Sequence, residues 1–455
     1  MLGRKDILWR QSPLSELTRL AWPICVSMLS YSAMTVADTA FVGAIGPAAL
    51  AGVGLAGTLA FAVLVFGIGL LRGVKVVVSQ AVGAAGNDAK GGSDKIEEVS
   101  AAGLLIALAM GVVVVALAQL VVLVVPMLAA SEQAGTYGAD YFRVRMWAAP
   151  LVYIFCTTRE TSYGLGNSRA PMVASLAANV VNISLDYVFI VKLGYGPSGA
   201  AWATVVATAL EAGLLLWLTN APGARCLAKG KRWLGAVLRV GLATGAQFAI
   251  EVGAFTLLTI LVAAMSETEM AGHQVALCVV HFAFLPIVAL SEAASVMAGQ
   301  AVGADRDELV PTIALYALGV ALFYAVTCTL VLLIGAPAIA GLFGDDAQVR
   351  ATATSLLYVA AAFQLGDAFN IIARGMLRGT GDVRVPAIIC VSVSWLALPP
   401  ITWFLGHHMG MGAVGAWLGL TSEIVVVAAI LWVRLWKGGW RQSAAQSRHA
   451  LAAHA

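Results

Sequence analysis

The groups within the long apolar stretches of the sequence that could do chemistry include nine charged residues. Seven are acids and two are bases: Asp38, Asp186, Glu211, Glu251, Glu292, Asp367, Glu423, Arg72 and Lys75. A charged side chain at the centre of a bilayer costs at least about 2.5 kcal/mol even on the mildest insertion scale. Such residues therefore point to ion or substrate pathways, although Glu211 and Glu423, towards the inner portions of their spans, are expected to be solvated or to pack between helices.

One pair of these polar residues has a spacing that favours cation binding. Asn182 and Asp186 are four residues apart, so a helix places both side chains on one face. A carboxylate, an amide oxygen and nearby hydroxyls suit a hard cation such as Na⁺, and a dehydrated carboxylate can instead hold a proton. The alternative is a structural polar network that joins helices. Asp38 could face this pair.

The composition requires a membrane around these groups. Of 455 residues, 60% are hydrophobic and only 11% are charged, whereas a soluble domain has about 25% charged residues. The 27 Lys and Arg against 24 Asp and Glu give a net charge of +3, so no basic excess indicates a nucleic-acid partner. The six Cys show no metal-binding spacing and are too sparse for a disulfide scaffold.

Apolar stretches long enough to cross a bilayer recur along the whole chain. They predict twelve helical spans, at approximately 14–41, 47–75, 98–125, 134–158, 170–192, 197–218, 236–263, 268–295, 308–335, 348–373, 384–405 and 411–434. Basic residues concentrate in alternate loops, which predicts a multi-pass protein of the cytoplasmic (inner) membrane with both termini cytoplasmic. The expected fold class is an all-α integral membrane protein.

The second half of the sequence repeats the first. Residues 80–84, Gln-Ala-Val-Gly-Ala, recur 220 positions later at 300–304, and a second set of matches has an offset of 215. Each copy holds six spans and begins on the same side, so the copies are parallel repeats. The predicted division has five parts: a cytoplasmic segment 1–13, an N-lobe 14–218, a cytoplasmic linker 219–235, a C-lobe 236–436 and a cytoplasmic tail 437–455.

Two such lobes with buried acids indicate a transporter that opens alternately to each side. We expect no enzymatic activity, and the absence of a GxxxxGK[ST] motif argues against direct drive by ATP. Two other function classes stay open: a flippase or exporter of lipid-linked precursors, and a channel or receptor without active coupling.

The ordered motifs of the chain resemble the multidrug and toxic-compound extrusion (MATE) transporters, bacterial type. They are AWPICVSMLSYSAMTVADTAFVG in span one, SQAVGA after span two, NISLDYVFI in span five and RGMLRGTGD after span ten. This resemblance covers roughly residues 14–436. It implies secondary active efflux of amphipathic or cationic organic compounds by antiport against Na⁺ or H⁺, with no other cofactor.

The resemblance also implies roles for particular residues. Asp38, Asn182, Asp186 and Thr204 match the amino-terminal-lobe cation site of family members, and Pro23 matches a proline that bends their first helix. Glu251 and Asp367 match acids that other members use in the carboxy-terminal lobe. Either lobe could therefore carry the coupling ion, and we favour the amino-terminal set because four oxygen-bearing residues match together.

Further expectations concern the gate, the substrate cavity and the partners. Arg72 corresponds to Glu292 across the repeat, so the two could pair as a gate, although separate helix ends reaching water would explain them equally well. Tyr31, Tyr153 and Phe363 could form aromatic walls for flat cations, or could simply pack. The expected partners are small organic cations or drugs and membrane lipids, and the expected functional form is a monomer.

Overall fold

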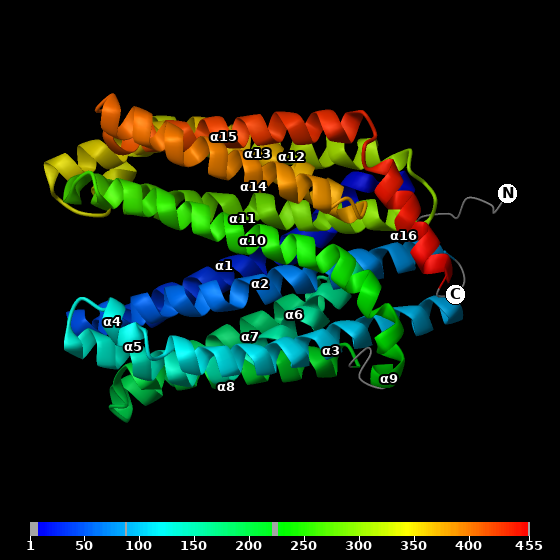
Figure 1. The fold of residues 1–455 in the computed structure, drawn as a ribbon, viewed down its shortest axis with the longest axis horizontal. Helices are drawn as coiled ribbons and strands as arrows, with labels where there is room; N and C mark the ends of the chain where they lie inside the picture. Colours follow the sequence, from blue (N-terminus) through cyan, green and yellow to red (C-terminus); the bar gives the residue numbers. More distant parts are fainter. Residues whose placement is uncertain (1–7, 87–88, 221–225, 454–455) are drawn as a thin grey trace. The chain divides into compact units, whose positions relative to one another are not determined.

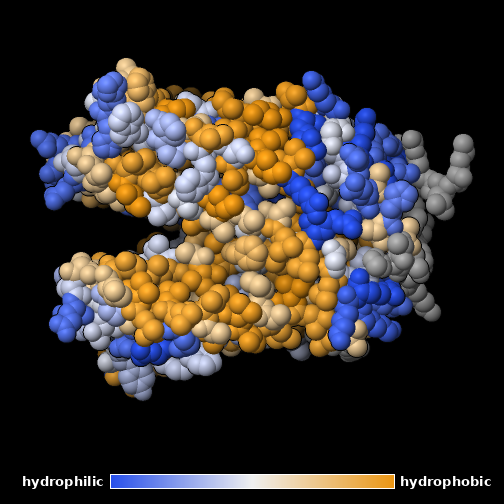
Figure 2. Space-filling model, viewed as in Figure 1, coloured by the Kyte–Doolittle hydropathy of each residue, from blue (hydrophilic) through white to orange (hydrophobic). Residues whose placement is uncertain are grey.

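The protein is helical throughout the part of the chain that the structure, a computed structural model, describes: residues 8–86, 89–220 and 226–453. Within these residues, eleven helices are long and apolar enough to cross a membrane. On the face drawn in Figure 2, hydrophobic residues cover the middle of the helices and hydrophilic residues lie at their ends. The prediction of an all-α membrane protein is confirmed.

The described residues divide into two compact units, whose helices are labelled in Figure 1. The first, here the N-unit, is Val26–Ala246. Its helices are the second part of α1 (Pro13–Gly43), α2 (Pro47–Ala85), α3 (Ala89–Val121), α4 (Val125–Leu128), α5 (Glu132–Arg145), α6 (Ala149–Gly164), α7 (Arg169–Asp186), α8 (Gly196–Leu218), α9 (Leu227–Gly230) and the first part of α10 (Leu234–Ala263). Short η2 (Met146–Ala148), η3 (Tyr187–Lys192) and η5 (Lys231–Trp233) connect them.

The second unit, here the C-unit, comprises the described residues up to Cys25 together with Gln247–Ala453. It contains η1 (Leu8–Gln11), the start of α1, the end of α10, α11 (Glu267–Gly303), α12 (Leu309–Gly341), α13 (Ala347–Gly379), α14 (Arg384–Thr402), η6 (Trp403–His408), α15 (Gly412–Trp436) and α16 (Arg441–Ala453). Its apolar core gathers buried residues of α10 to α15 around the fully buried Trp417.

The unit boundaries lie inside two helices. The chain passes from the C-unit to the N-unit within α1, two residues after Pro23, and returns within α10, between Ala246 and Gln247. The predicted lobes instead divide at the linker 219–235, so their boundaries stay a prediction. Residues 1–7 of the predicted amino-terminal segment and residues 221–225 of the predicted linker lie outside the described residues.

The internal repeat is visible in the backbone of the two units. The π-helical turns η3 and η6 begin 216 residues apart, at Tyr187 and Trp403. Gly194 and Gly410, also 216 apart, have φ angles of 67° and 68°, a left-handed conformation that glycine adopts without a steric penalty. Equivalent turns therefore follow α7 in the N-unit and α14 in the C-unit.

The fourth predicted span, 134–158, differs between the two copies. In the N-unit it folds as α5, η2 and α6, whereas α13 is one continuous helix over the positions 215 residues later. Pro150 explains the difference, because proline lacks an N–H and clashes with the carbonyl four residues earlier, at Met146, where the short 3₁₀ turn begins. The equivalent residue in α13 is Leu365.

Candidate functional site

Four predicted site residues come together in the N-unit, on α1, α7 and α8. The Asn182 amide, oriented by its hydrogen-bond partners, donates to Asp38 Oδ1 over 2.8 Å and accepts from the Thr204 backbone N–H over 3.3 Å. Asp186 lies one turn further along α7, within hydrogen-bonding range of Asp38. The spacing of Asn182 and Asp186 thus identified one face of a real cluster.

The charges of this cluster are not balanced by a fixed ion pair. Among the described residues, neither Asp38 nor Asp186 forms a salt bridge, and Asp186 Oδ1 is buried without a hydrogen-bond partner. Arg145 of α5 acts on Asp38 only at longer range. One distant arginine does not balance two carboxyl groups, so the cluster can also bind a proton or a Na⁺ ion. The carboxyl and amide oxygen atoms suit either one.

Glu251, the predicted C-lobe acid on α10, is held by a fixed cation instead. Arg374 of α13 donates to both carboxylate oxygens of Glu251, over 2.6 Å to Oε2. Gln247 donates a further bond of 2.9 Å from one turn earlier on α10. Glu251 therefore has its positive partner within its own unit.

Asp367, the other predicted C-lobe acid, lies one helical turn from Asn370 on α13. Asp367 is 3% exposed, its Oδ2 has no hydrogen-bond partner among the described residues, and Asn370 contacts it. Arg374 and Glu423 act on it electrostatically without a salt bridge. The structure therefore places Asp367 near Glu251's arginine but outside that ion pair.

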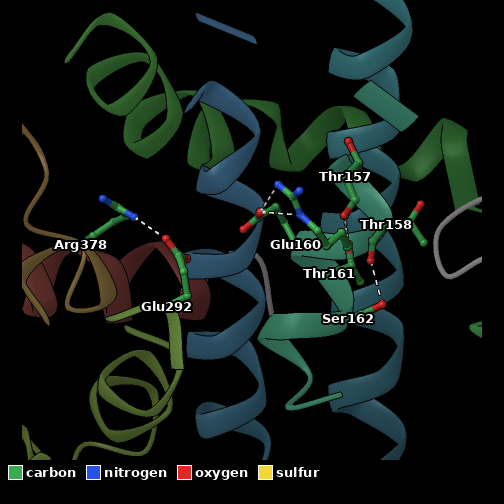
Figure 3. Close-up of polar contacts among 8 residues, drawn as sticks. Thr157, Thr158, Glu160, Thr161, Ser162, Glu292 and Arg378 are labelled. Atoms are coloured by element: carbon green, nitrogen blue, oxygen red, sulfur yellow. Dashed lines mark hydrogen bonds and ion pairs between the residues drawn. The ribbon is translucent and has the colours of Figure 1, made fainter. Parts of the chain in front are cut away.

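The two residues of the predicted gate belong to different units. Glu292 on α11 is ion-paired with Arg378 of α13 over 3.1 Å, and both lie in the C-unit (Figure 3). Arg72 on α2 belongs to the N-unit. The gate between Arg72 and Glu292 stays a prediction, and Arg378 is a partner that the sequence analysis missed.

A buried polar turn of α6, Thr157–Ser162, was also missed from the sequence. Arg159 forms a 3.0 Å ion pair with its neighbour Glu160, which is 2% exposed (Figure 3). Thr161 and Ser162 donate to the carbonyls of Thr157 and Thr158. The sequence matches Arg159 to Arg374 in the repeat and places it beside an inner loop, but its ion pair with Glu160 inside α6 was not predicted.

The remaining predicted residues are spread over both units. Pro23 is a buried residue inside α1. Tyr31 is 57% exposed, whereas Tyr153 is fully buried and donates from its hydroxyl to the Leu64 carbonyl. Phe363 is also buried and packs edge-on against Trp417. Tyr153 and Phe363 pack within their own units here, and a role for the three rings as cavity walls stays a prediction.

Known proteins are similar in sequence to this chain over nearly its whole length. The chain is 30% identical over 430 residues to the probable multidrug resistance protein NorM of Pseudomonas syringae pv. tomato, covering 91% of this chain and 92% of that protein. It is 31% identical over 438 residues to the probable NorM of Burkholderia pseudomallei, covering 92% and 91%.

Solved structures share the fold. A multidrug resistance MATE family transporter in an outward-facing conformation has a TM-score of 0.86 at 22% identity, covering 94% of this chain and 97% of the other. The eukaryotic MATE transporter AtDTX14 has a TM-score of 0.87 at 17% identity, covering 97% and 99%. The sequence model of the MatE family matches residues 23–188 and 243–403. This chain therefore belongs to the MatE family, the MATE transporters of multidrug efflux.

Proposed function

We propose that this transporter exports amphipathic or cationic organic compounds by antiport, with Na⁺ or H⁺ moving inward through the cluster of Asp38, Asn182, Asp186 and Thr204. The protein works as a monomer in the cytoplasmic membrane, with both termini inside and with two lobes that open alternately. The NorM names of its relatives support the substrate class. The ion and its site are our proposal.

One observation carries the choice of site. Asp38 and Asp186 contact each other without an ion-pair partner among the described residues, whereas Glu251 is bound by Arg374. A mobile cation can bind between two carboxyl groups more readily than it can displace a tethered guanidinium that makes two hydrogen bonds. The N-unit acids are therefore the better coupling site.

The cluster explains why either ion could drive the same protein. A hydrogen bond between two carboxyl groups needs a proton on one of them, and Na⁺ can relieve the same repulsion by binding their oxygens. The two ions therefore compete for one site. Loss of the ion leaves the carboxylates of buried Asp186 and half-buried Asp38 in repulsion, which favours a rearrangement of α1, the helix that carries both Asp38 and Pro23.

Purified protein in liposomes tests this proposal, with the Na⁺ gradient and the pH gradient imposed independently. A cationic dye such as ethidium should accumulate when one of the gradients is present and should not when both are absent. Drug accumulation that needs ATP and no ion gradient would contradict secondary transport. The arm that drives accumulation identifies the coupling ion.

A further inference from the structure

Two rows of polar side chains line the contact between α7 and α8 in the N-unit. The row on α7 is Ser175, Asn179, Asn182 and Asp186, and all four are at least 93% buried. The row on α8 is Thr204, Thr208 and Glu211. We call these seven residues the polar seam. Spacings of four and three residues place each row on one face of its helix.

The two rows meet at both ends. Near the cation site, the Asn182 amide oxygen accepts from the Thr204 backbone N–H. At the opposite end, the Ser175 hydroxyl donates to Glu211 Oε1 over 2.6 Å. Seven residues separate these two contacts on each helix, which is a rise of about 10 Å. The seam therefore joins two carboxyl sites through the unit, about two helical turns apart.

The middle of the seam contains polar atoms that can bind a cation in turn as it moves between the two ends. Asn179 donates to the Ser30 hydroxyl of α1 over 2.7 Å, and Thr208 donates to the Thr204 carbonyl over 2.7 Å. A hydroxyl that donates one bond keeps acceptor lone pairs for a proton carrier or a metal cation. Ionisable residues buried in membrane-spanning helices commonly mark ion pathways, so the seam, with a carboxyl group towards each end, is a candidate pathway.

The end of the seam at Glu211 lies beside apolar residues and near two arginines. Phe155, Ala174, Ala212 and Leu215 form a buried apolar cluster beside it. Arg159 and Arg145 act on Glu211 from α6 and α5. Cys156 and Tyr163 of α6 also face it, and they carry no fixed charge at neutral pH. A cation at Glu211 therefore meets a carboxylate that burial leaves poorly solvated, with the positive charge of Arg159 and Arg145 opposing its binding from nearby.

We propose that the coupling cation passes along the polar seam and that Glu211 is a second cation site at its inner end. The orientation predicted from the basic residues places this end of α8 towards the cytoplasm, where an inward-moving ion leaves. This inference rests on the proposed coupling at Asp38 and Asp186, and it adds to that function a residue about two helical turns further along α8 than Thr204.

Glu211→Gln tests the inference, because glutamine keeps the shape and removes the charge. We expect gradient-driven dye transport to slow by roughly tenfold, as for loss of a positioned proton carrier. Binding of the cation at the Asp38 site, followed as the ion-dependent change in tryptophan fluorescence of the purified protein, should stay as in the wild type. Glu211→Asp should recover part of the rate, since it restores a carboxylate.

The C-unit offers a matched control. Ser394 of α14 donates to Glu423 of α15 over 2.5 Å, which is the same hydroxyl–carboxyl pair on the equivalent helices. Glu423→Gln should leave the transport rate within about twofold, because α14 and α15 carry no corresponding row of polar residues. An equal loss of transport rate in Glu423→Gln and Glu211→Gln would overturn the inference. It would show that removing a carboxylate between these helices slows transport in either unit, whether or not a row of polar residues is present.

The outcomes separate this inference from the proposed function. If Asp38→Asn and Asp186→Asn lose coupling while Glu211→Gln transports at the wild-type rate, the seam is not the route and the coupling site stands. If Asp38→Asn and Asp186→Asn both keep full coupling, the proposed function fails whatever Glu211→Gln does. Separate Na⁺ and pH gradients show which ion the Glu211→Gln variant slows.

Discussion

The helix pairs α7–α8 and α14–α15 are equivalent in the repeat, yet only the first carries a row of polar residues. At an offset of 215, the seam residues have mostly apolar counterparts: Asp186 and Ile401, Asn182 and Ala397, Thr204 and Gly419, Glu211 and Val426, Ser175 and Cys390. Only Asn179 and Thr208 have polar counterparts, the bonded pair Ser394 and Glu423. The shared backbone is therefore maintained without shared polar chemistry.

The repeated arginine shows the same division. Arg159 and Arg374 are equivalent positions, but Arg159 pairs with the next residue, Glu160, whereas Arg374 pairs with Glu251 of another helix. Gly375 stands where the N-unit has Glu160, and Ser291 fills the space that a side chain there would need. As a result, the C-unit arginine neutralises an acid from another helix, and the N-unit arginine leaves Asp38 and Asp186 without an ion pair.

The largest expected effect comes from the acids that lack a fixed partner. Asp38→Asn and Asp186→Asn should each reduce gradient-driven efflux by roughly two orders of magnitude, because an amide cannot carry the coupling proton and is a weaker Na⁺ ligand. Dye efflux from cells and ion-driven uptake into liposomes both measure it. Full coupled transport in these variants, with loss in Asp367→Asn or Glu251→Gln, would move the coupling site to the C-unit.

Glu251→Gln should affect stability more than ion coupling. It leaves the Arg374 guanidinium in a largely buried site without its counter-charge, which costs about 3 kcal/mol. The melting temperature of the purified protein should fall by several degrees, while the dependence of transport on the ion gradient stays. The double variant Glu251→Gln, Arg374→Gln should recover part of the loss, and no recovery would show that the pair contributes little.

The sequence predicts the architecture well because it depends on composition and on helical periodicity. Long apolar stretches require helices in a membrane, and the repeat is confirmed by the matching turns after α7 and α14. The break between α5 and α6 was missed because the stretch was read as one apolar span, although Pro150 marks the place. The clustering of Asn182 and Asp186 followed from their spacing alone.

Contacts between distant helices could not be predicted in the same way. The pairs Arg374–Glu251 and Arg378–Glu292 join positions 123 and 86 residues apart, and helical spacing says nothing about which helix faces which. The match of Ser175 to Glu211 is of the same kind. Such pairs depend on helix packing, which the hydrophobic pattern of a membrane protein barely specifies since most faces are apolar.

The next test concerns stability at the buried ion pair of Glu292 and Arg378. Glu292→Arg or Arg378→Glu alone brings like charges together, and we expect each to lower the stability by at least about 3 kcal/mol. The double variant restores the attraction and should recover about half of the loss in melting temperature. Additive losses would show that the 3.1 Å contact is not energetically coupled.

The gate prediction is tested by transport in the same way. If Arg72 and Glu292 meet during the cycle, Arg72→Glu combined with Glu292→Arg should restore part of the transport that either variant loses. If transport recovers when the charges of Glu292 and Arg378 are exchanged, and not when those of Glu292 and Arg72 are exchanged, the functional partner of Glu292 is Arg378 and the gate prediction is wrong.

The smallest expected effect compares two equivalent tryptophans, Trp202 on α8 and Trp417 on α15. Trp417 is fully buried, and its indole N–H donates to His273 Nδ1 over 3.0 Å, whereas Trp202 is 47% exposed. Trp417→Phe removes the donor and leaves a buried imidazole nitrogen without its bond, so we expect a loss of about 1 kcal/mol in stability. Trp202→Phe should change the melting temperature by less than half as much, because it removes no such bond. Neither substitution touches the acids of either unit, so ion-driven transport should be unchanged in both. Equal destabilisation by the two substitutions would show that the two tryptophans contribute equally to the packing of their units. The difference between the units would then lie in their acidic residues alone.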